Sequence, residues 1–196
     1  MEQNVVYLLL LDGFADWEAA LATSEIRKAG RHSVVVAAPE GAPVRSMGGL
    51  RVTPDIALDD VDPSRAAMLI LPGGTSWEER ESPDVTATLN RFAERDVPIA
   101  ALCGSTLALA RAGLFRGRRH TSNMRGYLER HVPGYGGETN YVDEPAVRDG
   151  NLITASGMGG VEFAYEVIGL LDLMPEGDRE IWLKIFRDKR VPEGIA

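Results

Sequence analysis

Apolar residues in this chain are concentrated in four short, continuous runs. The runs cover residues 5–11, 33–38, 67–71 and 97–102. An unbroken apolar run of this length is typical of a strand that is buried on both faces, as strands are in a parallel sheet. The pattern therefore predicts four buried parallel strands.

Segments with helical patterns alternate with these runs. They cover residues 16–29, 83–95, 106–112 and 161–173, and the first and third stop at Gly30 and Gly113, which suit helix C-caps. Strands and helices in alternation imply right-handed crossovers and a doubly wound sheet. We therefore expect an α/β fold with a mainly parallel sheet.

Two hairpins and a C-terminal tail interrupt the alternation. Residues 39–62 are rich in glycine and proline and predict a hairpin through Val44 and residues 50–52. Residues 141–147 and 152–155 flank the Asp149-Gly150 turn signal, which predicts a second hairpin. We expect one domain at residues 1–174 and a tail at 175–196 whose helix, at 179–186, packs on this domain or on a partner subunit.

Composition narrows the class of protein. The chain of 196 residues is 44% apolar and 26% charged, which is typical of a folded globular domain. Its 29 acidic and 21 basic residues give a net charge of -8, which disfavours nucleic acids and anionic membranes as partners. One cysteine excludes an internal disulfide and a multi-cysteine metal site. With no secretory signal pattern visible, we expect a cytoplasmic protein.

Chemically active residues follow three of the predicted strands, and such strand ends meet at one edge of a parallel sheet. Cys103 lies between the fourth strand and a helix, where unpaired N–H groups favour a thiolate, so we expect an acidic, nucleophilic thiol. An inert buried cysteine is the alternative. Gly73, Gly74 and Gly104 lie at the same edge, where their N–H groups would form an oxyanion hole or merely a turn.

Two further residues are candidate acid–base partners of Cys103. Glu18 is placed at the start of the first helix, where it would either face the thiol or only pair with the helix dipole. His120 follows a basic run and is a candidate base. No pair of metal ligands has a recognised spacing, and no phosphate-binding loop or dinucleotide motif is visible, so we expect no metal and no cofactor.

These motifs together resemble the ThiJ/PfpI superfamily, which has the class I glutamine amidotransferase-like fold. The resemblance extends from about Val5 to Leu171. It rests on Gly13 with Glu18, on residues 71–74, 101–104, 112–114 and 117–122, and on the hairpin at 141–155. It implies a flavodoxin-like three-layer sandwich that forms a homodimer. It also implies that Cys103 is the nucleophile on a strand-to-helix elbow and that Glu18 is its carboxyl partner.

The sequence departs from two branches of that superfamily. The peptidase branch has a histidine directly after the cysteine, where this chain has Gly104, and the position that often carries a later histidine or tyrosine is Asn123. No His-x-Glu motif of a glutamine amidotransferase follows the last strand. We therefore predict a cysteine-dependent hydrolase or hydratase/lyase that acts on a small aldehyde, amide or isocyanide, with Trp17 and Asn123 lining its pocket.

Two alternatives use the same fold. One is an oxidative-stress sensor or protective protein, in which Cys103 is oxidised to the sulfinic acid without turnover. The other is a binding protein that has kept the fold and lost the chemistry. The reactivity of Cys103 distinguishes both from the enzyme.

Overall fold

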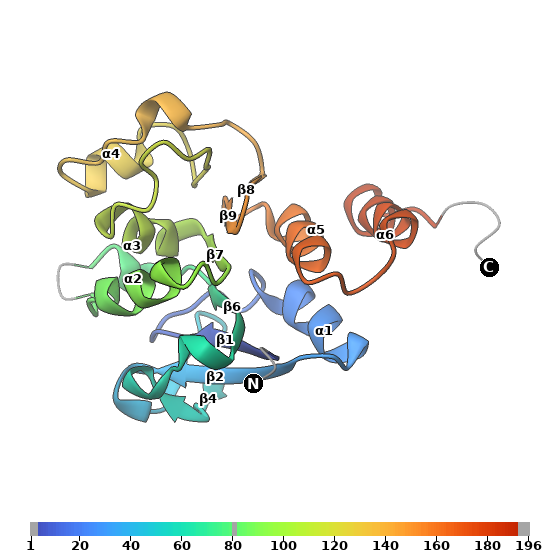
Figure 1. The fold of residues 1–196 in the computed structure, drawn as a ribbon, viewed down its shortest axis with the longest axis horizontal. Coiled ribbons are helices and arrows are strands. Elements are labelled where there is room, and N and C mark those ends of the chain that lie inside the picture. The colour runs from blue at the N-terminus through green and yellow to red at the C-terminus, as the bar shows by residue number, and fades with distance from the viewer. Residues whose placement is uncertain (1–3, 80–81, 192–196) are drawn as a thin grey trace.

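The structure is a computed structural model that describes residues 4–79 and 82–191, and a seven-stranded sheet forms its centre (Figure 1). The strand order is β5-β2-β1-β6-β7-β9-β8, and every pairing is parallel except that of β8 with β9. The strands are β1 (Val5–Leu9), β2 (Ser33–Ala38), β5 (Ile56–Ala57), β6 (Ala66–Leu71), β7 (Ile99–Leu102), β8 (Ala146–Asp149) and β9 (Leu152–Ala155).

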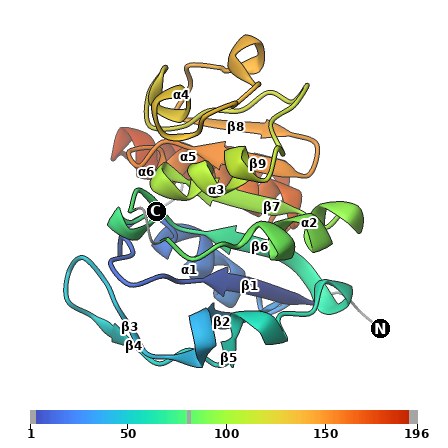
Figure 2. The same ribbon diagram turned by 90° about the vertical axis from the view of Figure 1, so that its left-hand side faces the viewer.

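Helices cover both faces of this sheet, as Figures 1 and 2 show. One face carries α1 (Ala20–Ala29), α5 (Gly160–Leu170) and α6 (Glu176–Asp188). The opposite face carries α2 (Thr86–Glu94), α3 (Thr106–Arg111) and α4 (Tyr127–His131). The expected α/β fold, a mainly parallel sheet in a three-layer flavodoxin-like sandwich, is confirmed.

The continuous apolar runs are explained by the two cores that flank the sheet. Val5, Tyr7 and Leu9 of β1 belong to the core beneath α2 and α3, whereas Val6 belongs to the core beneath α1 and α5. Alternate side chains of a strand point to opposite faces, so a strand that is covered on both sides needs apolar residues at successive positions.

The first predicted helix begins later than the sequence pattern indicated. It was expected from residue 16, but α1 starts at Ala20, and residues 16–19 form turns. The N–H of Ala15 donates to the carbonyl of Gly73 (3.0 Å), which ties this segment to the end of β6. Glu18 therefore lies in the turn before the helix and not in its first turn.

Both predicted hairpins are present. The first is the two-stranded antiparallel ribbon β3 (Val44–Arg45) and β4 (Arg51–Val52), which stands apart from the main sheet. The second is β8 and β9, joined at Asp149 and Gly150, at the edge of the main sheet. Only β9 continues the parallel order, so its carboxyl end lies at the same edge as that of β7.

Helix α6 packs on α5 of the same chain (Figure 1). Its Trp182 is buried in the core beneath α1 and α5, and the indole N–H donates to Oε1 of Glu25 in α1 (3.1 Å). Lys28 also donates to that carboxylate (2.9 Å). The tail helix thus packs on its own domain, which is one of the two alternatives that the sequence left open. The domain boundary after residue 174 stays a prediction.

Candidate active site

The loops that follow β1, β6 and β7 meet at the carboxyl edge of the sheet, because these three strands are adjacent in it. Phe14, in the loop after β1, forms an isolated bridge with Gly74, in the loop after β6. A Cβ atom added to Gly104, after β7, would lie 2.9 Å from the carbonyl oxygen of Gly74. The sheet thereby brings together residues that are far apart in sequence.

Cys103 occupies a sharp turn between β7 and α3. Its φ angle is +54°, in the left-handed region that residues with a side chain seldom adopt, and it opens the 3-10 turn Cys103–Ser105. Such a conformation costs roughly 1–3 kcal/mol and persists only where neighbouring interactions enforce it. This is the geometry of the nucleophile elbow that the sequence resemblance implied.

Two hydroxyl groups hold the elbow in place. Ser105 Oγ accepts the N–H of Leu102 (3.0 Å) and donates to the carbonyl of Leu71 at the end of β6 (2.6 Å). The hydroxyl of Thr106 donates to the carbonyl of Cys103 itself (2.6 Å). Both hydroxyls are fully buried, so the strained turn is fixed to the two central strands.

Glu18 faces Cys103 from the loop after β1. Its side chain is 1% exposed, and Oε2 accepts the N–H of Gly73 at 2.5 Å. Oε1 is buried and has no hydrogen-bond partner among the described residues. A Cβ atom at Gly73 would lie 2.5 Å from Cβ of Cys103 and 2.8 Å from Oε2 of Glu18. Only glycine at residue 73 leaves room for this Cys–Glu pair.

Gly157 forms the other wall of the pair, and the sequence analysis missed it. A Cβ atom there would lie 3.1 Å from Sγ of Cys103 and 3.2 Å from Oε1 of Glu18. The signal that could have identified it is the glycine-rich stretch 156–160, which directly follows β9 at the same carboxyl edge. The sequence analysis read β9 only as one arm of a hairpin.

Asn123 and Trp17 complete the surroundings of the sulfur. Nδ2 of Asn123 donates to Sγ of Cys103 (3.3 Å), and its Oδ1 accepts the N–H of Gly157 (3.0 Å). Nε1 of Trp17 donates to the carbonyl of Gly157 (3.3 Å), while the indole remains 57% exposed. The structure thus brings both residues to Cys103, with Trp17 at the rim.

Burial raises the pKa values of both partners, and at Cys103 the charge of Glu18 adds to the effect. Burial raises the pKa of Glu18, and the N–H of Gly73 opposes this only in part. Burial and the facing Glu18 carboxylate raise the pKa of Cys103 to about 11, against the smaller effects of the N–H groups of Asn123 and Gly104. The prediction of an acidic thiol is therefore wrong, because burial and Glu18 hold the pKa of Cys103 above its ordinary value.

The reason lies in the helix that follows. Helix α3 has only six residues and is preceded by the 3-10 turn, so few aligned N–H groups face the sulfur. The carboxylate of Glu18 acts at closer range and in a buried environment, where electrostatic interactions are weakly screened. Burial first, and then proximity to Glu18, therefore outweigh the N–H groups that face the sulfur.

His120 is held away from Cys103. The ring is 0% exposed, its Nδ1 interacts with the carbonyl of Arg118 (2.7 Å), and its Nε2 interacts with the hydroxyl of Tyr135. The imidazole also stacks on Phe115 with a ring-centroid distance of 4.0 Å. Both ring nitrogens are thus engaged elsewhere, and burial lowers the pKa of the ring. The structure does not bring the proposed base to the thiol.

The three glycines expected to form an oxyanion hole have different roles. The N–H of Gly73 is directed to Glu18, and that of Gly104 lies against the Cys103 sulfur. Gly74 is required for close packing, since a Cβ atom there would lie 2.5 Å from the carbonyl oxygen of Gly13. A role of Gly74 and Gly104 in binding an oxyanion stays a prediction.

Two further features are absent from the part of the chain that the structure describes. Within residues 4–79 and 82–191, no group of three or more His, Cys, Asp or Glu side chains is arranged to hold a metal ion. In the same part of the chain, no helix is long and apolar enough to cross a membrane.

The protein is an α/β sandwich that carries a cysteine on a strained turn between a strand and a helix, opposite a buried glutamate. These features together define its class. Residues 4–170 match the model of the DJ-1/PfpI family, and the chain belongs to this family. It is 34% identical to the uncharacterized protease YoaZ of Bacillus subtilis, over 97% of this chain and 94% of that protein. It is 32% identical to the deglycase TK1284 of Thermococcus kodakarensis, over 76% and 88% respectively.

Solved structures agree with this assignment. The DJ-1 superfamily protein Atu0886 of Agrobacterium tumefaciens superposes with a TM-score of 0.88 at 38% identity, and the match covers 95% of this chain and 98% of that one.

Proposed function

We propose that the protein is a cysteine-dependent hydrolase or lyase whose substrate is a small electrophile, with an aldehyde as the leading candidate. The observation that carries the proposal is the pairing of the half-buried Cys103 with the buried Glu18, in which Oε1 of the carboxylate has no other partner among the described residues. Relatives named protease or deglycase, among them TK1284, support an enzymatic role.

The first chemical step uses both members of the pair. The Sγ atom of Cys103 attacks the carbonyl carbon, and the thiol proton passes to Glu18. The carbon–oxygen double bond becomes an alkoxide, which takes the proton back from Glu18 to give a hemithioacetal. The raised pKa of Glu18 favours both transfers, since a carboxyl group with a pKa nearer neutrality both accepts and returns a proton readily. The N–H groups of Gly74 and Gly104 are proposed to bind the alkoxide.

The same geometry disfavours peptide hydrolysis and glutamine amidotransfer. Both reactions expel an amine or ammonia, and cysteine enzymes of these types use a histidine to protonate the leaving group. Here Gly104 follows the cysteine and His120 is engaged by Tyr135. Glu18 is left as the acid in contact with the nucleophile.

A panel of small electrophiles tests this proposal. Methylglyoxal, a small amide and an isocyanide are incubated with the wild-type protein, with Cys103→Ala and with Glu18→Gln. We expect turnover of at least the aldehyde, its loss in Cys103→Ala and a strong reduction in Glu18→Gln. Wild-type turnover that persists in Cys103→Ala, or no turnover of any compound, would contradict the proposal.

A second candidate function is protection against oxidants. The unpartnered Oε1 of Glu18 and the N–H of Asn123 both face the sulfur, and together they could hydrogen-bond the oxygens of a sulfinate. Two equivalents of hydrogen peroxide would each transfer one oxygen to sulfur and leave as water. Mass spectrometry after mild peroxide treatment should then show two added oxygens on Cys103. An unchanged thiol would exclude this function.

We also propose that the protein works as a cytoplasmic homodimer. The family resemblance implies a dimer, and a lone oxidisable thiol at the centre of the site fits a reducing compartment. Light scattering on the purified protein is expected to give twice the 21.3 kDa mass of the chain. A mass equal to that of one chain would exclude the dimer.

A further inference from the structure

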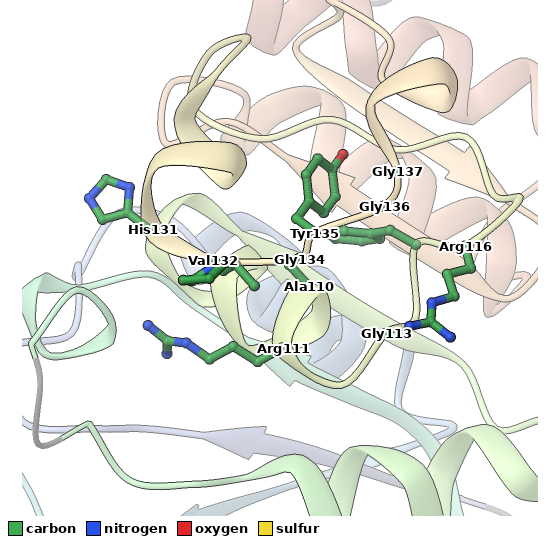
Figure 3. A pocket seen from close by; sticks show the side chains of 12 residues that line it. Ala110, Arg111, Gly113, Arg116, His131, Val132, Gly134, Tyr135, Gly136 and Gly137 are labelled. Atoms are coloured by element: carbon green, nitrogen blue, oxygen red, sulfur yellow. The ribbon is translucent and has the colours of Figure 1, made fainter.

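A cavity lies at the opposite end of α3 from Cys103 and takes no part in the chemistry described above. Its volume is about 340 Å³. The cavity is bounded by the end of α3, by the turn that follows α3 and by residues 131–137, which begin at the last residue of α4 (Figure 3). Cavities that hold small molecules are roughly 300–1,000 Å³ in volume. The cavity is therefore large enough for a small ligand.

The side chains around this cavity are unusual for so acidic a chain. Arg111, Arg116 and His131 line it, and no Asp or Glu is among its lining residues. The chain as a whole has 29 acidic residues and 21 basic ones. Figure 3 shows Arg111 and His131 at the left of the lining and Arg116 at the right. Basic side chains are therefore gathered at this site, although the protein as a whole is acidic.

The loop that closes the cavity offers backbone donors. Gly134, Gly136 and Gly137 line it, and among the described residues their N–H groups make no hydrogen bond. The N–H of Tyr135, by contrast, donates to the carbonyl of Val132 (3.1 Å). Free backbone N–H groups beside guanidinium groups are the donors that bind anions in proteins.

The remaining walls are apolar and held in place. Phe115, Val132 and Tyr135 contribute to them. Phe115 stacks on His120, whose Nε2 interacts with the hydroxyl of Tyr135. The buried histidine that the active site does not use therefore fixes two aromatic walls of this cavity. A ligand with a small apolar body would meet a preformed surface.

Arg116 distinguishes this cavity from a neighbouring one. Arg111 and His131 also line a neighbouring cavity that contains Glu78, Glu79 and Asp84, and Arg111 donates to the carbonyl of Trp77 (3.2 Å). Arg116 lines the first cavity and is absent from the lining of the second. Its guanidinium makes no hydrogen bond or ion pair with the described residues, so it is available to a ligand.

We propose that this cavity binds a small organic phosphate. The planar fork of Arg116 matches the geometry of phosphate oxygens, and the glycine-rich loop supplies further N–H donors. The aromatic walls take up the organic part. No carboxylate is among the lining residues, and the acidic side chains that act on the Tyr135 wall, Glu129 and Glu138, lie outside the lining.

Titration with phenyl phosphate tests the site in the full-length protein. Isothermal calorimetry should show saturable binding of one molecule per chain. Arg116→Gln is expected to weaken binding at least about tenfold, because a charge-assisted hydrogen bond is lost. Arg91→Gln, on the exposed face of α2, is the matched control and should bind as the wild type does. Binding should persist in Cys103→Ser, which separates this site from the active site.

Backbone NMR shifts locate the ligand independently. During the titration, the amide signals of Gly134, Gly136 and Gly137 should move together, whereas those of Gly73, Gly104 and Gly157 should not. Phenol should bind far more weakly, and benzoate more weakly than phenyl phosphate. The absence of saturable binding, equal affinity in Arg116→Gln, or shifts confined to the glycines around Cys103 would overturn the proposal.

Discussion

At the scale of single residues, the reactivity of the site depends on one shared proton. The Glu18 carboxyl group is buried and Cys103 is half-buried, and burial makes both groups costly to ionise, with the charge of Glu18 adding to the cost at Cys103. The N–H groups of Asn123 and Gly104 partly stabilise a thiolate. Glu18 therefore disfavours the thiolate in the resting site, and in the proposed reaction it takes up the thiol proton.

Replacing Glu18 by Gln should lower the pKa of Cys103. The substitution removes the negative charge and keeps an acceptor for the N–H of Gly73. The rate of alkylation by iodoacetamide, measured as a function of pH, should show a midpoint at lower pH in Glu18→Gln than in the wild type. Glu94→Gln, at an exposed position of α2, serves as the matched control. A midpoint that moves upward would mean that Glu18 acts on the thiolate as a hydrogen-bond donor.

Gly73→Ala should disrupt the site through its volume alone. The new methyl group would lie 2.5 Å from Cβ of Cys103. Overpacking of this kind costs about 1–3 kcal/mol in the free energy of unfolding, and we expect loss of turnover as well. Urea denaturation measures the first effect. Gly136→Ala is the control, because a methyl group there meets no atom within 4 Å and stability should change little.

At the scale of secondary-structure elements, α6 is attached to the sandwich by one buried side chain. Trp182 of α6 is buried in the core together with side chains of α1 and α5, and its indole N–H donates to the carboxylate of Glu25. The tilted contact with Phe186, at a centroid distance of 4.5 Å, extends the same apolar surface. Docking of the helix therefore combines hydrophobic burial with a hydrogen bond to a carboxylate that Lys28 also binds.

Two substitutions at residue 182 should separate these contributions. Trp182→Phe keeps an aromatic ring and loses the N–H, and we expect a loss of about 1–3 kcal/mol in the free energy of unfolding. Trp182→Ala also loses the ring, and we expect about 3–5 kcal/mol. Thermal and urea denaturation provide the values. Equal effects of the two substitutions would show that the hydrogen bond, not the buried ring, attaches α6.

At the scale of the whole molecule, stability is linked to the ionisation of the site. The pKa of Glu18 is raised in the folded state, so the folded protein binds a proton more tightly than the unfolded chain does. The resulting stabilisation is fully present below the unfolded value of about 4.5 and is lost as the pH rises through the folded value. The active site therefore costs the molecule stability at neutral pH.

Glu18→Gln should remove this pH dependence. We expect the variant to gain free energy of unfolding relative to the wild type at pH 7–8, and to gain less at pH 4, where the wild-type carboxyl group is largely protonated. Urea denaturation of both proteins at the two pH values measures the difference. A gain of the same size at both pH values would show that Glu18 is not the group responsible.

The sequence by itself determined the architecture and the place of the cysteine in it. Continuous apolar runs such as residues 33–38 indicate strands buried on both faces, because burial requires apolar side chains at every position. The strand-to-helix junction identified Cys103 as an elbow residue, and the order of the motifs identified the family. These features are local in sequence, so a single chain displays them.

Only the tertiary structure decided which groups act on the thiol. Glu18, Asn123 and Gly157 reach Cys103 because β1, β6, β7 and β9 end at one edge, whereas His120 turns into the Phe115 and Tyr135 cluster. The sign of the pKa shift followed from burial and from a carboxylate distant in sequence. Distances between segments, the depth of burial and the direction of a side chain depend on packing, and packing is not visible in a linear pattern.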